Sequence, residues 1–521
     1  MNFTQLINLG QSIYETDDAK YNISIVLNSD GNLCKLTQQN IKSLNIVDNF
    51  QLPFHSGVID ILNNNDILES SNTPLLKLLA PGFKFINNGR DFLFVYISPY
   101  TSNILDNIQN DSNIAMLFVV TGTEDIFIDG DKIKRIYLKD AIEEYLNEYK
   151  GNFSTGIYAY KISEYKKSKK NENQQLNLNK FTSSIKIEDN DKLAVSQLSN
   201  QERSLTTGQC LALLLDKLFE DTYIDSDFWD YGGPSIFYSE TSNESFLEIL
   251  HNLLKLHNAS SSDKDKCYLN YRINLETNEY EWTFYSISYI FKSSPHKFLL
   301  EKLQLVADNM DFKGNESQSV NDSNVKTVGF YGNTGIINKF FFSDFSAEQN
   351  LEYIKSKFIY NYDNINKEFL IDCESSNFDN ILKNFTLNYI PEKLDWYSNT
   401  PYNEFQLNNC NIEHIRNLYS KETNVSIGRN ITMNNLIALN NSIQFISIGN
   451  TCRKSGYFIL LEKENASSDN QFFNKILGLY FILSVHHIFA DKRYTNNIIG
   501  TKPFYNFKPI ASNNYTIKSY E

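Results

Sequence analysis

Two runs near the end of the chain decide its fold: IQFISIGNTCRKSGYFILL at 443–461 and GLYFILSVHHIFADKRYTNNII at 478–499. Both are rich in β-branched and aromatic residues, which suit a pleated, half-buried surface. Turn-forming residues interrupt them at Gly449-Asn450 and Asp491-Lys492-Arg493. Such a meander of antiparallel strands usually forms a small barrel, because closure removes unpaired strand edges. The expected strands are 443–448, 457–461, 478–489 and 494–499, after a short helix at 433–439.

The N-terminal part of the chain is also rich in expected strands. Residues 3–14 suit a short amphipathic helix, and a second helix with one apolar stripe is expected near 139–149. The polar, lysine-rich stretch 166–180 suits an exposed loop, because it cannot bury a core. Strands are expected at 23–27, 44–47, 58–62, 84–86, 92–97, 115–120 and 156–165.

The middle of the chain mixes helices with strands. The pattern Thr206-x-x-Gln209 resembles a capping box before a leucine-rich helix, and another helix starts near Asn243. Two strands, 268–275 and 280–290, flank a hairpin-like turn. Beyond them, 328–420 is irregular and rich in Asn. Strands are expected there near 336–342 and 368–373.

These segments predict a β-rich α+β fold with several domains, because 521 residues exceed what one ordinary core holds. We expect two small antiparallel β-barrel domains and a mixed α/β middle region. The expected divisions are an N-terminal helix or arm at 1–20, a first barrel at 21–180, the middle domain at 181–325, and a second barrel with an irregular insertion at 326–521.

Composition narrows the class of protein. The net charge of −14 argues against a sequence-independent grip on nucleic acid, which needs clustered Lys and Arg. The six cysteines form no CxxC pair, so we expect thiols in a reducing cytoplasm. The N-terminus lacks a secretory signal pattern. The most apolar stretch, 476–485, is about half of what a bilayer crossing needs, so we expect no membrane partner.

No motif with a defined chemistry stands out. The glycines of 329–335 have neither dinucleotide-fingerprint nor phosphate-loop spacing. His486 and His487 are neighbours in a strand, so their side chains point to opposite faces and cannot readily share a metal. His251 and His257 do not have the spacing of a zinc-protease helix. We therefore expect no enzyme activity and no catalytic, cofactor-binding or metal-binding residues.

Three separated segments follow one another in an informative order. They are the strands at 43–48 and 56–62, the helix at 245–250 with the paired strands that end at 286–291, and the C-terminal run from Gly449-Asn450 through Arg453–Ile459 to Gly478–His486. In this order they resemble the tail-hub family, the central hub proteins of contractile-tail phage baseplates. The region 328–420 has no counterpart in that pattern.

The resemblance implies a structural protein that assembles as a homotrimer. Two barrels per chain would place six similar units around an axis, joining a sixfold tail tube above to a threefold spike, or a lysozyme-spike protein, below. Other baseplate proteins would be neighbours, and DNA would pass only transiently through the lumen, where an acidic wall would repel it. The implied location is the virion tail baseplate, after synthesis in the bacterial host cytoplasm.

The alternative is a virion protein of the tail tip that binds carbohydrate or a receptor. Aromatic side chains could line a glycan groove in such a protein. This interpretation predicts an exposed cluster of Trp and Tyr beside carboxylates, but the three tryptophans, at 229, 282 and 396, occur in scattered contexts.

Overall fold

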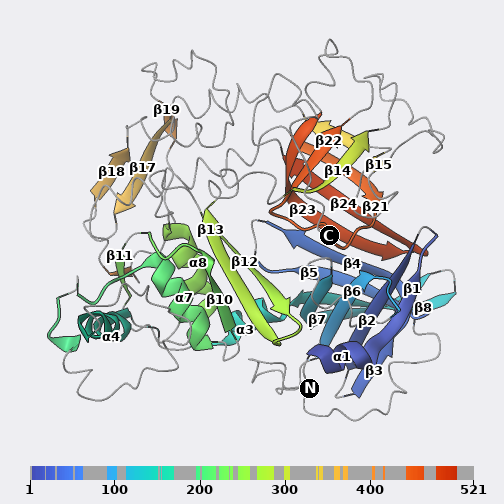
Figure 1. The fold of residues 1–521 in the computed structure, drawn as a ribbon, viewed down its shortest axis with the longest axis horizontal. Helices are drawn as coiled ribbons and strands as arrows, with labels where there is room; N and C mark the ends of the chain where they lie inside the picture. Colours follow the sequence, from blue (N-terminus) through green and yellow to red (C-terminus); the bar gives the residue numbers. More distant parts are fainter. Residues whose placement is uncertain are drawn as a thin grey trace.

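The computed structural model describes most of 3–62, 91–102, 113–168, 195–257, 267–286, 299–305, 442–462 and 477–501, with short gaps inside these ranges, and isolated strands between 336 and 416. The described elements are mostly β-strands with a few helices, arranged in one large and several small sheets (Figure 1). This confirms the β-rich α+β class. Within these ranges, no helix is long and apolar enough to cross a membrane.

The N-terminal segment forms the first half of the large sheet. Its elements are α1 (Phe3–Gly10), β1 (Gln11–Glu15), β2 (Lys20–Ser29), β3 (Asn32–Leu36), β4 (Ile41–Asn49), β5 (Ser56–Leu62), β6 (Phe92–Pro99), β7 (Ile114–Ile128), β8 (Asp131–Asp140) and α3 (Ala141–Glu148). The helix expected over 3–14 ends earlier, because residues 11–15 pair with β2 instead. The strand expected at 84–86 lies outside the described residues.

Strand β6 separates two hydrophobic cores. Its side chains alternate between them, with Phe92, Phe94 and Tyr96 on one side and Leu93, Val95 and Ile97 on the other. The first core continues into the helices of the middle region, and the second includes Phe489 and Tyr494 from the C-terminal strands. β6 is therefore buried on both faces, as its continuous apolar run predicts.

The segment expected as a strand at 156–165 is a helix, α4 (Thr155–Ser168), so that prediction is wrong. Its aromatic residues favoured a strand assignment. The buried side chains of Ala159 and Ile162 are three positions apart, which is the spacing of one helix face. The expected exposed loop at 166–180 begins inside this helix, and most of it lies outside the described residues.

The middle region confirms both helices and the hairpin. Its elements are β9 (Leu205–Thr206), α7 (Thr207–Leu218), β10 (Thr222–Trp229), β11 (Ser235–Tyr238), α8 (Phe246–Leu256), β12 (Cys267–Asn274) and β13 (Glu279–Ser286). The Thr206 hydroxyl accepts from Gln209 N at 3.3 Å, and Gln209 Oε1 accepts from Thr206 N at 3.2 Å, which confirms the capping box. β10 pairs with β13 in parallel, an arrangement that the sequence did not predict.

The C-terminal strands lie close to their predicted ranges. The strands at 458–462, 478–490 and 493–501 form the predicted antiparallel meander, but the strand at 442–448 pairs with 493–501 instead of with the next strand along the chain. The described elements are β14 (Leu299–Leu305), β15 (Ile336–Ile337), β16 (Phe340–Ser343), β17 (Lys357–Asp363), β18 (Glu368–Asp372), β19 (Tyr402–Glu404), β20 (Ile415–Arg416), β21 (Ser442–Ile448), β22 (Phe458–Glu462), β23 (Gly478–Ala490) and β24 (Arg493–Thr501). β17, β18 and β19 form a small separate sheet. The helix expected at 433–439 lies outside the described residues.

One continuous sheet joins the two ends of the chain. β4 pairs antiparallel with β23, from Asn49 opposite Ser484 to Ser43 opposite Ala490. In Figure 1 the C-terminal strands accordingly lie directly against the N-terminal ones. The paired strands run from β1 to β15, with a branch at β23 that leads through β24 and β21 to β16 and another at β2 to β3. Among the described strands, no pairing returns to close this path into a barrel. The two barrels and the domain boundaries therefore stay predictions.

Candidate functional site

The segment that carries the hub-like motif, Gly449–Tyr457, lies where the C-terminal strands meet the N-terminal sheet. It connects β21 to β22 and packs beside the end of β4. Gly456 N donates to Ile482 O at 3.0 Å, and Phe50 N donates to Leu483 O at 2.8 Å. Gly456 has a φ of +84°, a conformation that suits glycine. The motif is thus the contact between the two ends of the chain.

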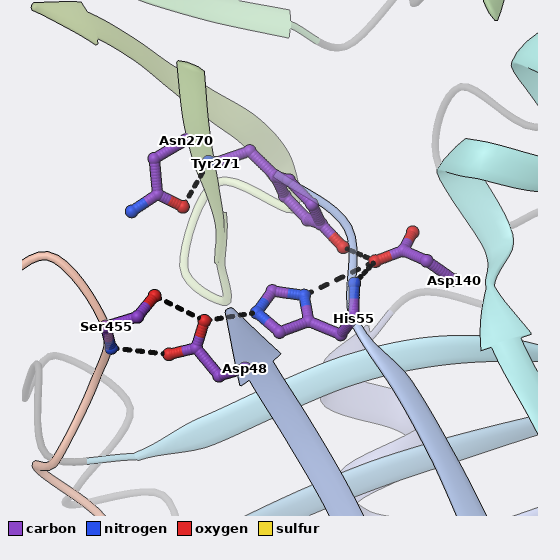
Figure 2. A network of polar contacts seen from close by, with 6 residues as sticks. All are labelled: Asp48, His55, Asp140, Asn270, Tyr271 and Ser455. Carbon is purple, nitrogen blue, oxygen red and sulfur yellow. Dashed lines mark hydrogen bonds and ion pairs between the residues drawn. The ribbon is translucent and has the colours of Figure 1, made fainter. Parts of the chain in front are cut away.

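A chain of polar side chains crosses this contact and is called here the polar junction: Asp48, His55, Asp140, Tyr271 and Ser455 (Figure 2). The Ser455 hydroxyl donates to Asp48 Oδ1 at 2.7 Å, and Ser455 N donates to Asp48 Oδ2 at 2.7 Å. His55 lies between the two carboxylates, with Nε2 3.7 Å from Asp48 Oδ1 and Nδ1 3.3 Å from Asp140 Oδ2. The junction therefore joins the N-terminal, middle and C-terminal parts of the chain.

Asp140 is the most connected member of the polar junction. Its side chain is 2% exposed and caps helix α3 by accepting from Ile142 N at 2.9 Å. Its Oδ2 accepts from His55 N at 3.0 Å and from the Tyr271 hydroxyl. Because β8 ends at Asp140, α3 begins there, and Tyr271 lies on β12, one carboxylate fixes three elements.

The electrostatics of the polar junction favour a charged histidine. Burial by itself lowers the pKa of His55, but the hydrogen bond to Asp140 and the charges of Asp48 and Asp140 outweigh it, and the pKa is raised. Burial first, and then the charge of Asp140, raises the pKa of Tyr271 well above its usual value. The junction therefore holds a neutral tyrosine and a histidine that is protonated over a wider pH range than usual.

The order of groups is not that of a nucleophilic triad. A serine nucleophile needs the histidine as its direct partner, with a carboxylate behind the ring. Here the Ser455 hydroxyl donates to Asp48, and the carboxylate stands between the serine and His55. The arrangement stabilises contacts between segments, and the group next to the Ser455 hydroxyl is a carboxylate instead of an imidazole.

A buried arginine holds the turn of the motif from inside. Arg453 is 0% exposed, and its Nη1 donates to Ile448 O at 2.6 Å and Asn496 Oδ1 at 3.0 Å, and to the Ser447 hydroxyl at 2.5 Å. Asn496 Oδ1 also accepts from Asn450 N at 2.7 Å. The Gly-Asn turn and the arginine of the hub-like motif are thus parts of one network.

Aromatic packing explains the glycine of the turn. A Cβ on Gly449 would lie 2.2 Å from the ring of Tyr494, so no larger residue fits without a shift. The Tyr494 ring stacks on Phe489 at 3.9 Å between centroids, and the Tyr21 hydroxyl donates to Gly449 O at 3.0 Å. The turn at Gly449 therefore contacts both Tyr21 near the N-terminus and Tyr494 near the C-terminus.

The histidines and tryptophans considered in the sequence pack inside the protein wherever the structure describes them, except that His251 and His486 are half-buried. His487 is buried and lies 2.7 Å from the Tyr494 hydroxyl. Burial lowers the pKa of His487 to about 3. Trp229 and Trp282 are buried, so neither lines a surface groove. The glycines of 329–335 and the third tryptophan, at 396, lie outside the described residues.

Sequence reasoning missed the polar junction because its members are far apart. Asp48 and Ser455 are separated by 407 positions, and no local spacing links an aspartate in a strand to a distant serine. It also gave no sign that Asp230, His257 and Cys267, whose ligand atoms lie within 4.8 Å of one another, would meet. Only the hub-like order of segments pointed to the region around Ser455.

Replacing Ser455 with alanine is expected to loosen the contact between the two ends of the chain. The variant loses a hydrogen bond to a buried carboxylate, which costs about 1–2 kcal/mol. Amide hydrogen exchange in 449–457 should then be roughly 5–30-fold faster. Ser43→Ala is the matched control, because the Ser43 hydroxyl also donates to a carboxylate, Asp60, but within the N-terminal sheet. If amide hydrogen exchange in 449–457 is equally fast in both variants, the hydrogen bond from Ser455 to Asp48 does not stabilise this contact.

His55 is expected to make stability depend on pH. A histidine whose folded pKa is raised stabilises the fold fully below its unfolded pKa of about 6.5, and this contribution is lost as pH rises through the folded value. The difference in unfolding free energy between wild type and His55→Gln should therefore shrink as pH rises past neutral. His487→Gln is the opposite control, since its lowered pKa destabilises the fold as pH falls below about 6.5. If the difference in unfolding free energy between wild type and His55→Gln does not change with pH, the pKa of His55 is not raised in the folded protein.

No protein-family model matches the chain, and no curated protein sequence matches it. Several solved structures align with most of it. The tail protein from Neisseria meningitidis MC58 aligns with a TM-score of 0.42 and 7% identity, covering 92% of this chain and 96% of that one. The 43 kDa tail protein of prophage MuSo2 from Shewanella oneidensis aligns with a TM-score of 0.43 and 8% identity, covering 92% and 98%.

A third structure comes from a secretion system. It is an E. coli component of the type VI secretion system, described as structurally similar to bacteriophage T4 tail proteins. Its TM-score is 0.34 at 9% identity, and the alignment covers 90% of this chain and 76% of that one. The structures that this chain is similar to thus include phage tail and type VI secretion proteins.

Proposed function

We propose that this chain is a structural, non-enzymatic subunit of a phage tail baseplate hub. Three copies form a ring that joins the tail tube to the central spike and lets DNA pass through its lumen. Each copy contributes two β-barrel units, one from 21–180 and one from 326–521. The partners are further copies of the chain, a tail-tube protein, a spike or lysozyme-spike protein, and other baseplate proteins of the virion.

One observation carries this proposal: the residues of the hub-like motif join the two β-rich ends of the chain edge to edge. Ser455 binds Asp48 beside the β4–β23 pairing, and Arg453 holds the turn that presents it. If three such chains surround a threefold axis, their two β units alternate around the ring. The six units then match the six subunits of one layer of the tail tube. Closed rotational symmetry of this kind also limits growth of the assembly.

Features of the described residues favour this function over carbohydrate binding. Trp229 and Trp282 are core residues, with 6% and 0% exposure, rather than a stacking platform. In the polar junction, the carboxylate of Asp48 separates Ser455 from His55, which suits a stabilising contact. The net charge of −14 suits a channel wall that repels DNA.

The molar mass of the full chain in solution tests the proposal. Light scattering is expected to give three times the 60.3 kDa of one chain, and electron microscopy to show a ring with an open centre. Adding a tail-tube or spike protein should raise the mass further. A stable monomer whose mass does not change with either partner would overturn the hub, and a monomer that binds oligosaccharide would support the tail-tip alternative.

The sign of charge in the channel is a separate test. A reconstruction of the ring is expected to show acidic side chains along the lumen. The outer surface of the ring is the reference for this comparison, because DNA does not pass along it and its charge can have either sign. A predominantly basic channel wall would contradict free passage of DNA, while leaving the trimeric assembly intact.

A further inference from the structure

Three side chains with metal-binding chemistry meet at one end of the small sheet formed by β10, β13 and β12. Asp230 directly follows β10, Cys267 opens β12, and His257 caps the C-terminus of α8. Their ligand atoms, one from each residue, all lie within 4.8 Å of one another. Since each residue comes from a different element, tertiary folding brings the three together.

His257 has the geometry of a metal ligand. Its side chain is 1% exposed, and its Nδ1 lies 2.8 Å from the Thr207 hydroxyl. Its Nε2 has no hydrogen-bond partner among the described residues and lies 3.8 Å from Asp230 Oδ1. A buried ring nitrogen without a partner is costly, and a metal ion would satisfy it.

The neighbouring residues fix this ring in place. The Phe284 ring lies 4.5 Å from the imidazole, edge to face, and Thr207 holds the opposite nitrogen, as an outer hydrogen-bond partner of a ligating histidine does. Gly233 leaves room for both, because a Cβ there would lie 2.2 Å from the Thr207 hydroxyl and 2.8 Å from His257 Nδ1. The position of the imidazole is thus set by its surroundings.

Asp230 is held just as firmly. Its backbone N donates to Phe284 O at 2.7 Å, and its Oδ1 accepts from Gly232 N at 2.7 Å. Cys267 is paired with Ser286 at the end of the hairpin. The three ligands therefore project from backbone that the sheet, its turn and the helix end already fix.

We propose that Asp230, His257 and Cys267 bind one divalent transition-metal ion of the zinc type. Thiolate, imidazole and carboxylate are the donors that zinc takes, whereas magnesium and calcium prefer oxygen alone. Bonds of about 2.0–2.3 Å in a tetrahedral site place ligand atoms roughly 3.5 Å apart. The 3.8 Å between His257 Nε2 and Asp230 Oδ1 is close to this value. Small side-chain adjustments would bring in the third ligand, and water would take the fourth position.

On binding, the Cys267 thiol loses its proton to solvent and its sulfur coordinates the metal, with no change of oxidation state. The ion ties the end of α8 to β10 and β12, so its role is to stabilise the middle region. The inference does not depend on the hub function, because all three ligands belong to one part of one chain.

Cobalt binding by the purified full chain tests the site. One equivalent of Co²⁺ is expected to give a thiolate-to-cobalt charge-transfer band and the absorption of a tetrahedral ion, and Zn²⁺ should displace both. Cys267→Ser is expected to remove the charge-transfer band, and His257→Gln to weaken binding at least about tenfold. Cys210→Ser is the matched control, since Cys210 is also buried but lies outside the cluster, and it should leave the band unchanged.

Wild-type protein alone can overturn the proposal. If it binds less than a stoichiometric amount of Co²⁺ and of Zn²⁺ after removal of chelators, the site does not exist. A charge-transfer band that persists in Cys267→Ser would place the metal elsewhere. Because the stoichiometry of the unmodified chain decides the question, a variant that fails to fold does not obscure the outcome.

Discussion

Replacing Arg453 with alanine is expected to cost about 3–5 kcal/mol, which would largely uncouple the C-terminal strands from the N-terminal sheet. The side chain is fully buried, and its Nη1 supplies hydrogen bonds to Ser447, Ile448 and Asn496. The variant leaves these acceptors without that donor and opens a cavity beside the Gly449-Asn450 turn. Urea unfolding, followed together with hydrogen exchange in 449–457, measures the loss.

Two further variants separate the causes of this loss. Arg453→Met keeps most of the volume and is expected to lose nearly as much, because the acceptors still lack their donor. Arg493→Ala is the matched control: its side chain is 72% exposed, and its ion pair with Asp17 at 3.8 Å should contribute nothing measurable. If Arg453→Ala is no less stable than Arg493→Ala, the buried network does not hold the turn.

Asp140→Ala is expected to destabilise the fold by about 3–5 kcal/mol. The change removes the N-cap of α3 and the acceptor of the Tyr271 hydroxyl, and it leaves His55 without its nearest carboxylate. Each loss occurs in a buried setting, where water cannot replace the missing partner. The urea midpoint should fall, and hydrogen exchange should quicken in both α3 and β12.

The control for Asp140 lies on the neighbouring strand β5. Asp60 accepts from Arg135 at 2.8 Å and 3.0 Å and from the Ser43 hydroxyl, but it caps no helix and its arginine partner is 35% exposed, so Asp60→Ala should cost less, about 1–2 kcal/mol. Asp140→Asn retains the shape of the side chain and part of the cap. It should be intermediate in stability and should weaken the pH dependence attributed to His55. Equal midpoints for Asp140→Ala and Asp60→Ala would show that the polar junction adds no stability.

Local pattern was enough to predict much of the fold. The positions of the C-terminal strands were predicted from alternation and from turn residues, although the pairing of β21 with β24 was not. Asp491 and Lys492 take the positive φ values, +49° and +58°, of a tight turn. The capping box at Thr206 was likewise predicted from adjacent residues. These features depend on contacts between near neighbours, which the order of residues records directly.

The errors and omissions have a common physical origin in tertiary contacts. In α4, aromatic residues that favour a strand take part in a helix because one face packs on the core. The parallel pairing of β10 with β13 and the meeting of Asp48 with Ser455 bring together residues that no local rule relates. The candidate site was therefore predicted only as a segment with a family-like order.

The β4–β23 pairing has a consequence for how the chain folds during synthesis. Asp48 meets Ser455 across 407 positions, so the large sheet cannot be completed until nearly the whole chain has left the ribosome. Pairings this distant in sequence form slowly, because a long loop must close before any contact compensates for its entropy. Until then, β4 keeps one unpaired edge, which a neighbouring nascent copy could occupy instead. We therefore expect the chain to need chaperones while it folds, and we expect misfolded chains to exchange strands with neighbouring copies.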